Sequence, residues 1–101
     1  KGTLKDFKGA ISDFSKAIMI DSKYAKAYYN RGLSKDELKD YEGAISDYTK
    51  VIGINPNDAD AYYNRGLSKY YLGYVNGACK DARKAQELGY YASAFIEATC
   101  N

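Results

Sequence analysis

Apolar residues recur along this chain at spacings of three and four, which is the period of one face of an α-helix. The pattern is clearest in the middle of the chain, at Tyr41, Ala44, Ile45, Tyr48, Val51 and Ile52. A comparable face is formed by Ala27, Tyr28, Gly32 and Leu33. Both segments are therefore predicted to be amphipathic helices that bury one side.

Short breaks separate these helical segments. Lys39-Asp40 lies between the two helices above, and Asn55-Pro56-Asn57-Asp58 follows the second one. Because proline cannot continue a helix, we expect this helix to end near Ile54, before Pro56. Asp58 is expected to cap the next helix by accepting its free backbone N–H groups. The basic unit is therefore a helix hairpin.

The hairpin is repeated along the chain. Residues 27–35 and residues 61–69 both read AYYNRGLSK, at an offset of 34 residues. The same offset relates DFKGAISDFSKAI at residues 6–18 to DYEGAISDYTKVI at residues 40–52, and a third, diverged copy begins at Tyr74. Two different segments that share one period indicate a stack of similar hairpins, each of which buries its apolar face on its neighbours.

A helix–turn–helix of this length, with aromatic-x-x-x-Gly in its first helix and Gly-Ala-Ile in its second, resembles the tetratricopeptide repeat. Gly32 and Gly66 resemble the small first-helix residue of that family, and its small second-helix partner is matched by Ala10, Ala44 and Ala78. The resemblance implies an all-α fold of antiparallel helix-hairpin repeats stacked as a right-handed α-solenoid. We expect one domain over residues 1–101, made of a second helix from a truncated repeat (1–24), full repeats at 25–58 and 59–92, and a C-terminal capping helix at 90–101.

The resemblance also implies a function, because the first helices of such arrays line a concave side where an extended peptide or a partner helix lies. We therefore expect a protein–protein interaction module, a scaffold or adaptor. The candidate peptide-binding residues are Lys26, Tyr29, Asn30, Leu33, Tyr63, Asn64, Leu67, Tyr70 and Tyr71, with Asp36, Glu37 and Asp60 beside them. An Asn side chain offers both a donor and an acceptor to a peptide backbone, and tyrosine supplies contact area at low entropic cost. For Tyr29 and Tyr63, contact with a ligand and simple packing along the groove both remain open.

Some members of the family hold the C-terminal Asp of heat-shock chaperones in a carboxylate clamp, and this chain matches only part of that clamp. Lys26 and Asn30 resemble its first element, and Asn64 resembles its second. Ala94 and Ala98 stand where the third element has two cations. Because those cations would hold the charge of the tail, capture of a chaperone tail is not favoured.

An apolar stripe at the N-terminal edge of the array suggests an alternative function. Ala10 is expected to face a small residue 12 positions upstream, before Lys1, so we expect the chain to be part of a longer protein. The stripe is then expected to be exposed, and to be covered by residues outside the chain or by another chain. Self-association through this edge would give a homo-oligomer; the stripe consists of Phe7, Ile11, Phe14 and Ile18.

Composition argues against other classes of protein. The 101 residues suffice for one small domain, and a hydrophobic content of 46% argues against disorder. No apolar run approaches the roughly 20 residues of a membrane span, and a net charge of +2 is too small to indicate nucleic acid as the main partner. Because the chain has no histidine and only two cysteines, no catalytic, metal or cofactor site is predicted. We therefore expect a cytoplasmic binding protein that is not an enzyme.

Charged residues also recur at the repeat period. Arg31 and Arg65 are accompanied by Asp13, Asp47 and Asp81, which predicts structural ion pairs between helices. The sequence leaves open whether Arg31 pairs with Asp13 or with Asp47. A further basic group is interpreted as a solvated helix face; it consists of Lys80, Arg83 and Lys84.

The two cysteines allow two interpretations. Cys79 occupies a position held by Ile11 and Ile45 in the other copies, so it is expected to be a small buried apolar residue. A disulfide to Cys100 on the closing helix is geometrically conceivable, and it would imply an oxidising compartment.

Overall fold

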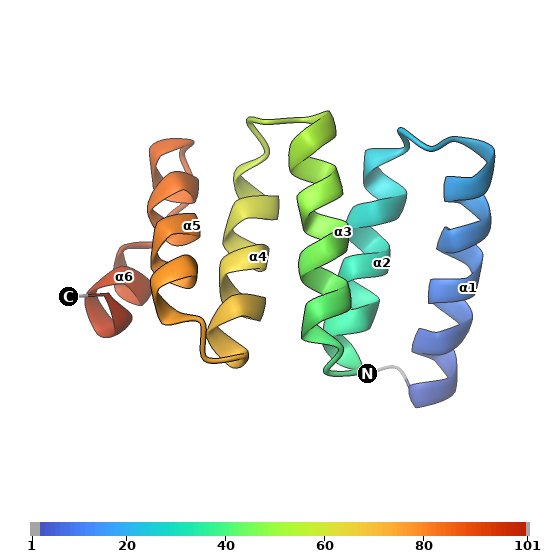
Figure 1. The fold of residues 1–101 in the computed structure, drawn as a ribbon, viewed down its shortest axis with the longest axis horizontal. Coiled ribbons are helices and arrows are strands. Elements are labelled where there is room, and N and C mark those ends of the chain that lie inside the picture. Colours follow the sequence, from blue (N-terminus) through green and yellow to red (C-terminus); the bar gives the residue numbers. More distant parts are fainter. Residues whose placement is uncertain (1–2, 101) are drawn as a thin grey trace.

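The computed structural model describes residues 3–100, which contain six α-helices and no strands. The first five helices run alternately up and down and pack side by side in chain order, and the short sixth helix lies against the fifth at the end of the stack (Figure 1). They form an elongated body of 40 × 27 × 20 Å. The predicted all-α stack of helix hairpins is confirmed, whereas Lys1, Gly2 and Asn101 lie outside the described residues. The helices are α1 (Leu4–Ile20), α2 (Ala25–Glu37), α3 (Tyr41–Ile54), α4 (Ala59–Tyr71), α5 (Val75–Glu87) and α6 (Ser93–Thr99).

Local signals define where these helices begin. Thr3 and Asp6 form a capping box at the start of α1, since each side chain accepts a hydrogen bond from the backbone N–H of the other. Asp40 caps α3 by accepting from the N–H of Gly43 at 3.0 Å, and Asp58 caps α4 by accepting from the N–H of Ala61 at 3.1 Å. The predicted role of Asp58 and the predicted end of α3 at Ile54 are both confirmed.

Small residues allow the helices of each hairpin to pack closely. A Cβ atom on Gly66 would lie 3.1 Å from the carbonyl oxygen of Ala78, which is the contact between a glycine and an alanine that the repeat pattern predicts. In the preceding hairpin the neighbour is a ring instead, because a Cβ atom on Gly32 would lie 2.7 Å from Tyr48 Cε1. Tyr48 is fully buried, so this ring fills the centre of the hairpin.

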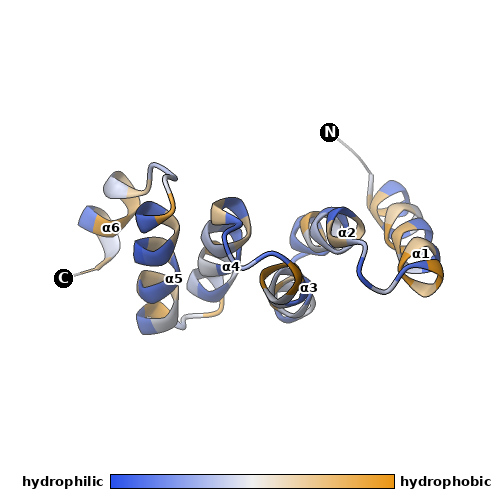
Figure 2. Cartoon of the chain, turned by 90° about the horizontal axis from the view of Figure 1, so that it is seen from above, coloured by the Kyte–Doolittle hydropathy of each residue, from blue (hydrophilic) through white to orange (hydrophobic). Residues whose placement is uncertain are grey.

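The apolar stripe of α1 is not the exposed edge that the sequence predicted. Its four residues, Phe7, Ile11, Phe14 and Ile18, are half-buried, because α1 packs against α2 and uses this stripe as its inner face. Ile18 packs against the buried cluster formed by Tyr28, Val51 and Ala61. The hydrophobic residues that α1 leaves most exposed are others, namely Leu4, Met19 and Ile20, and Figure 2 shows hydrophobic colouring over much of this helix.

Ion pairs also join neighbouring helices. Arg31 donates to both carboxylate oxygens of Asp47 on α3, at 2.9 and 2.7 Å, and also to the hydroxyl of Ser15 on α1 at 2.9 Å. The same arrangement recurs one repeat later, where Arg65 donates to both oxygens of Asp81 at 2.8 Å. The predicted structural pairs are thus confirmed, and the partner of Arg31 is Asp47.

The C-terminal segment is tied to the last hairpin. Cys79 on α5 is buried, as predicted, and it forms a disulfide with Cys100, which follows α6. Disulfides persist in oxidising compartments, whereas the cytosol keeps thiols reduced. This bond therefore counts against the cytoplasmic location expected from the sequence. Within residues 3–100, no helix combines the length and the apolar character that crossing a membrane requires.

Candidate functional site

The first helices of the two repeats, α2 and α4, are joined by a polar contact between side chains. Tyr29 of α2 and Asn64 of α4 lie 35 positions apart in the sequence, yet Asn64 Nδ2 donates to the hydroxyl of Tyr29 at 2.7 Å. Both side chains are only half-buried, so their remaining surface is accessible. We call the surface that α2 and α4 share around this hydrogen bond the α2–α4 face.

A hollow of about 340 Å³ lies on one side of this hydrogen bond, where α2 and α4 begin. Tyr29 and Lys26 line it from α2, and two carboxylates line it from the start of the next repeat, Asp58 and Asp60. Burial raises the pKa of the Tyr29 hydroxyl, and the negative charges of Asp60 and Asp58 raise it further. The hydroxyl therefore stays protonated and can donate to a ligand at neutral pH.

A second hollow of about 340 Å³ lies on the other side, where α2 and α4 end. Asp36 stands at its base, where Tyr48 Oη donates to one carboxylate oxygen at 2.6 Å and Ser68 Oγ donates to the other at 2.7 Å. Burial raises the pKa of Asp36, and these two hydrogen bonds oppose that rise. The carboxylate thereby links α2, α3 and α4 and holds the side chains at the base of the hollow in place.

Two tyrosine rings form a wall of this second hollow. Tyr41 at the start of α3 and Tyr71 at the end of α4 are stacked, with ring centroids 5.2 Å apart. Tyr71 is strongly exposed, so one ring face remains available for contact. The acid Glu37 and the apolar Leu67 complete the lining together with Lys39, Asn64 and Ser68.

The C-terminal segment covers part of α4. Tyr90 stacks on Tyr63 with ring centroids 4.4 Å apart, and Phe95 of α6 meets the rings of Tyr63 and Tyr70 edge-on at 6.1 and 5.6 Å. Because the disulfide of Cys100 holds this segment on α5, these contacts belong to the folded domain. Tyr63 and Tyr70 thus present less surface to a ligand than their position in the repeat suggests.

The structure brings five of the nine predicted binding residues into the two hollows. Lys26 and Tyr29 line the first hollow. The second contains Asn64, Leu67 and Tyr71. Asn30 and Leu33 line neither hollow, and Tyr63 and Tyr70 contact the C-terminal segment instead.

Several residues of the site were not among the predicted ones. Tyr41 and Lys39 line the second hollow, although the sequence places Lys39 at a turn and Tyr41 on the apolar face of the helix that follows. Asp58 was expected only to cap α4. The spacing of these residues in the sequence did not predict that they line the hollows, because their position there depends on how one hairpin packs on the next. Nowhere in residues 3–100 do three Cys, Asp or Glu side chains gather in a way that could hold a metal ion.

Comparisons with known proteins agree with this architecture. The family model of the tetratricopeptide repeat matches residues 25–58, and no curated protein matches the chain. Among solved structures, the first tetratricopeptide domain of Spaghetti (RPAP3) is 23% identical with a TM-score of 0.88, and the alignment covers 94% of this chain and 78% of that one. The tetratricopeptide domain of Arabidopsis OM64 is 27% identical with a TM-score of 0.85, covering 93% and 79%.

A further solved structure has higher identity, but a smaller share of its length is covered. MamA is 35% identical with a TM-score of 0.80, and the alignment covers 82% of this chain and 48% of MamA, so the chain spans about half of that protein. The repeat matched at residues 25–58 comprises α2, α3 and the turn that follows them. The period of 34 residues, the stacked hairpins and these matches together place the chain in the tetratricopeptide repeat family.

Proposed function

We propose that this chain is a protein–protein interaction module that binds an extended peptide segment along the α2–α4 face. The observation that carries the proposal is the hydrogen bond between Asn64 and Tyr29, which places two half-buried polar side chains between two hollows. An extended peptide that crosses this point can pair its backbone with the remaining polar atoms of both side chains. Its own side chains then have a hollow on either side.

The chemistry of the two hollows suits a peptide with mixed side chains. The first hollow offers the ammonium of Lys26 and the carboxylate of Asp60, so it accepts a polar side chain of either charge. The second offers the ring of Tyr71, the apolar surface of Leu67 and the carboxylate of Glu37. A long side chain with an apolar stem and a polar end fits that combination, since the stem packs on the ring while the end reaches the acid.

An acidic chaperone tail fits this face less well. The Spaghetti domain that shares the fold is bound to the HSP90 peptide SRMEEVD, which ends in a carboxylate-rich stretch. In this chain Ala94 and Ala98 stand at the positions expected for the clamp cations, and both are exposed residues of α6. We therefore propose a peptide whose binding does not depend on two charge-assisted hydrogen bonds to its C-terminus.

The test is a selection for binding peptides followed by mapping. A random peptide library is selected on the wild-type chain alone, and the selected peptides are then measured on Tyr29→Ala/Asn64→Ala, which removes the polar pair from the α2–α4 face. Ser46→Ala on the exposed side of α3 is the matched control. We expect selected peptides that bind wild type and Ser46→Ala equally, lose at least tenfold in affinity on the double variant, and shift amide resonances of α2 and α4. Selected peptides that bind all three proteins equally would refute the proposal.

Self-association is a second candidate function, favoured by the exposed apolar residues of α1. Met19 is 85% exposed and Ile20 is 89% exposed, which is unusual for adjacent large hydrophobic side chains on a helix. Sedimentation equilibrium over a hundredfold concentration range would detect it as a rising average mass, and Met19→Lys/Ile20→Lys should then abolish the rise. A constant monomer mass for the wild type excludes this function.

A further inference from the structure

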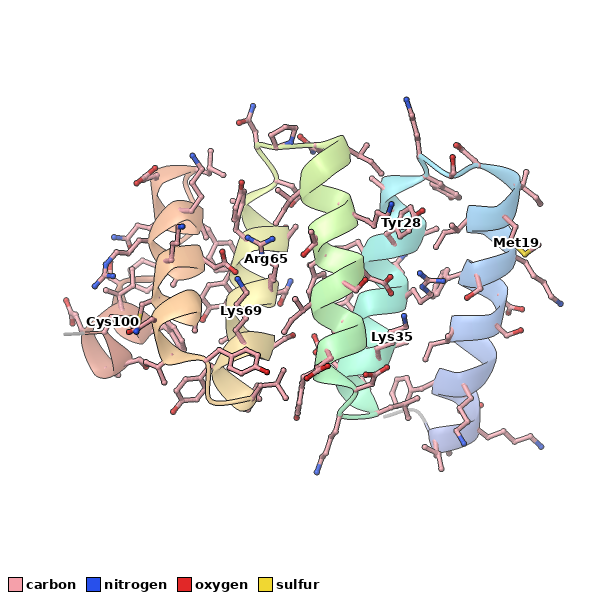
Figure 3. All side chains as sticks on the ribbon, viewed as in Figure 1. Met19, Tyr28, Lys35, Arg65, Lys69 and Cys100 are labelled. Atoms are coloured by element: carbon pink, nitrogen blue, oxygen red, sulfur yellow. A yellow bond between two sulfur atoms is a disulfide. The ribbon has the colours of Figure 1, made fainter. Side chains whose placement is uncertain are left out.

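A third hollow lies between α4 and α5, away from the α2–α4 face. Its volume is about 560 Å³, larger than either hollow of that face. Figure 3 shows Arg65 and Lys69 close together on α4, and both contact Asp81 of α5. Four cations and two carboxylates line this hollow together with two neutral polar side chains; the lining residues are Tyr62, Arg65, Asn76, Lys80, Asp81, Arg83, Lys84 and Glu87.

Most of the charge in this hollow is already paired. The carboxylate of Asp81 is nearly fully buried, and it accepts from Arg65 at 2.8 Å and lies 3.1 Å from the ammonium of Lys69. Lys84 lies 3.8 Å from Glu87 on the same helix. The ion pairs found within residues 3–100 include neither Lys80 nor Arg83. The hollow therefore carries two cations whose charge no carboxylate neutralises.

The preceding repeat provides an internal comparison. The buried part of the arrangement is the same in both repeats, because Tyr28, Arg31 and Asp47 correspond to Tyr62, Arg65 and Asp81. The two cations, in contrast, are specific to α5, and in α3 their positions are held by hydroxyl residues, Ser46 and Thr49.

The residue at the position of Asn76 also makes α5 more positive than α3. In α3 the corresponding residue is the acid Glu42, so α5 has lost a negative charge at the rim as well as gained two positive ones. The fold does not require these cations, since α3 packs in the same way without them. Lys80 and Arg83 are three positions apart on one helix and therefore lie on one side of it.

We propose that this hollow binds the phosphate group of a phosphorylated peptide. The guanidinium of Arg83 presents a planar fork of N–H donors that matches phosphate oxygens, and Lys80 adds a point charge. The amide of Asn76 and the hydroxyl of Tyr62 supply neutral donors at the same hollow. Two unneutralised cations match the charge of a phosphate monoester, which is close to −2 at neutral pH.

Charge and size favour a single phosphate group over a nucleic acid. Binding a nucleic acid depends on several neutralised phosphates along an extended basic surface. Here the free cations number two, they share one hollow, and the net charge of the whole chain is only +2. The hollow nevertheless exceeds a phosphate ion in size, so a phosphorylated side chain can enter it together with part of its backbone.

The test compares three short peptides on the wild-type chain by amide chemical-shift titration. The peptides are acetyl-Gly-phosphoserine-Gly-amide, the same peptide with serine, and the same peptide with glutamate; inorganic phosphate is titrated separately. The loss variant is Lys80→Ser/Arg83→Thr, which introduces the residues that the fold carries at these positions in α3. Lys50→Ser on α3 is the control, because it removes a cation outside the hollow. Urea unfolding is used to check that all three proteins are equally stable.

The phosphoserine peptide is expected to shift the amides around Lys80 and Arg83 of the wild type and to saturate. Its affinity should fall at least tenfold in Lys80→Ser/Arg83→Thr and stay unchanged in Lys50→Ser. Inorganic phosphate should shift the same amides more weakly. Equal affinity for the glutamate peptide, equal affinity of the loss variant, or shifts scattered over all lysines would each overturn the proposal. Because none of these readouts involves the α2–α4 face, they are independent of the proposed groove.

Discussion

Replacing Asp47 by alanine removes the acid that joins α2 to α3. Its side chain is 2% exposed, and it accepts two hydrogen bonds from Arg31, at 2.9 and 2.7 Å. The ammonium of Lys35 lies 3.2 Å from the same carboxylate. The substitution therefore leaves two neighbouring cations without their common partner, in addition to a small cavity.

The size of the effect follows from this burial. Removing one member of a buried ion pair costs about 3–5 kcal/mol, because the remaining charge stays desolvated. The side chains of Arg31 and Lys35 are 19% and 20% exposed, so water partly compensates them. We therefore expect a loss at the lower end, about 3 kcal/mol, in the free energy of unfolding. A domain of this size has a total stability of about 5–15 kcal/mol, so the loss is large but leaves a folded protein.

The assay is urea unfolding followed by circular dichroism at 222 nm. The repeat supplies the control, since Asp13 holds the same position in α1 but is exposed and takes part in none of the ion pairs of residues 3–100. Asp13→Ala is expected to change the free energy of unfolding by less than about 0.5 kcal/mol. A loss below about 1 kcal/mol for Asp47→Ala would refute the reasoning, because the pair would then contribute no more than an exposed ion pair.

Four further outcomes are expected in the same assay. Gly32→Ala should destabilise by about 1 kcal/mol, since overpacking against the buried ring of Tyr48 outweighs the gain in helix propensity; a more stable variant contradicts this. Lys39→Gly should stabilise by about 1 kcal/mol, because Lys39 has φ +63° in the turn after α2, and an unchanged midpoint contradicts this. Cys100→Ser should cost about 3 kcal/mol under oxidising conditions and nothing under reducing conditions, since the disulfide closes a loop with a sequence separation of 21. Burial raises the pKa of the Tyr48 hydroxyl above the value of about 10 in the unfolded chain. The protonated hydroxyl therefore contributes fully to the free energy of unfolding below pH 10, and this contribution is lost as the pH rises further. Tyr48→Phe should reduce the loss of stability at alkaline pH by about 1.4 kcal/mol per pH unit.

Features that depend on spacing within one hairpin were predictable from the sequence. The period of 34 residues gave the hairpins, Pro56 and Asp58 gave the turn between repeats, and the recurrence of arginine with aspartate gave the ion pairs. Each of these signals acts over one or two helical turns or is repeated at a fixed offset. The physical information is therefore present in the local pattern.

Features that depend on how hairpins pack on one another were not predictable in the same way. The stacking of Tyr41 on Tyr71 and the hydrogen bond from Asn64 to Tyr29 both join different repeats, and helical spacing does not specify the rotation between repeats. The contact of Phe95 with α4 was missed for another reason. The segment that carries it departs from the repeat, so no offset gave its position.

The identity of residues 27–35 and residues 61–69 has a consequence for folding kinetics. The two stretches present nearly the same side chains to α3, so α3 meets two almost equivalent partners while the chain is still unfolded. Each of the two contacts closes only a short length of chain, because α2 and α4 are both adjacent to α3 in the sequence. Low contact order of this kind permits rapid folding that starts in either hairpin. The order of the helices in the stack is therefore set by chain connectivity more than by side-chain recognition.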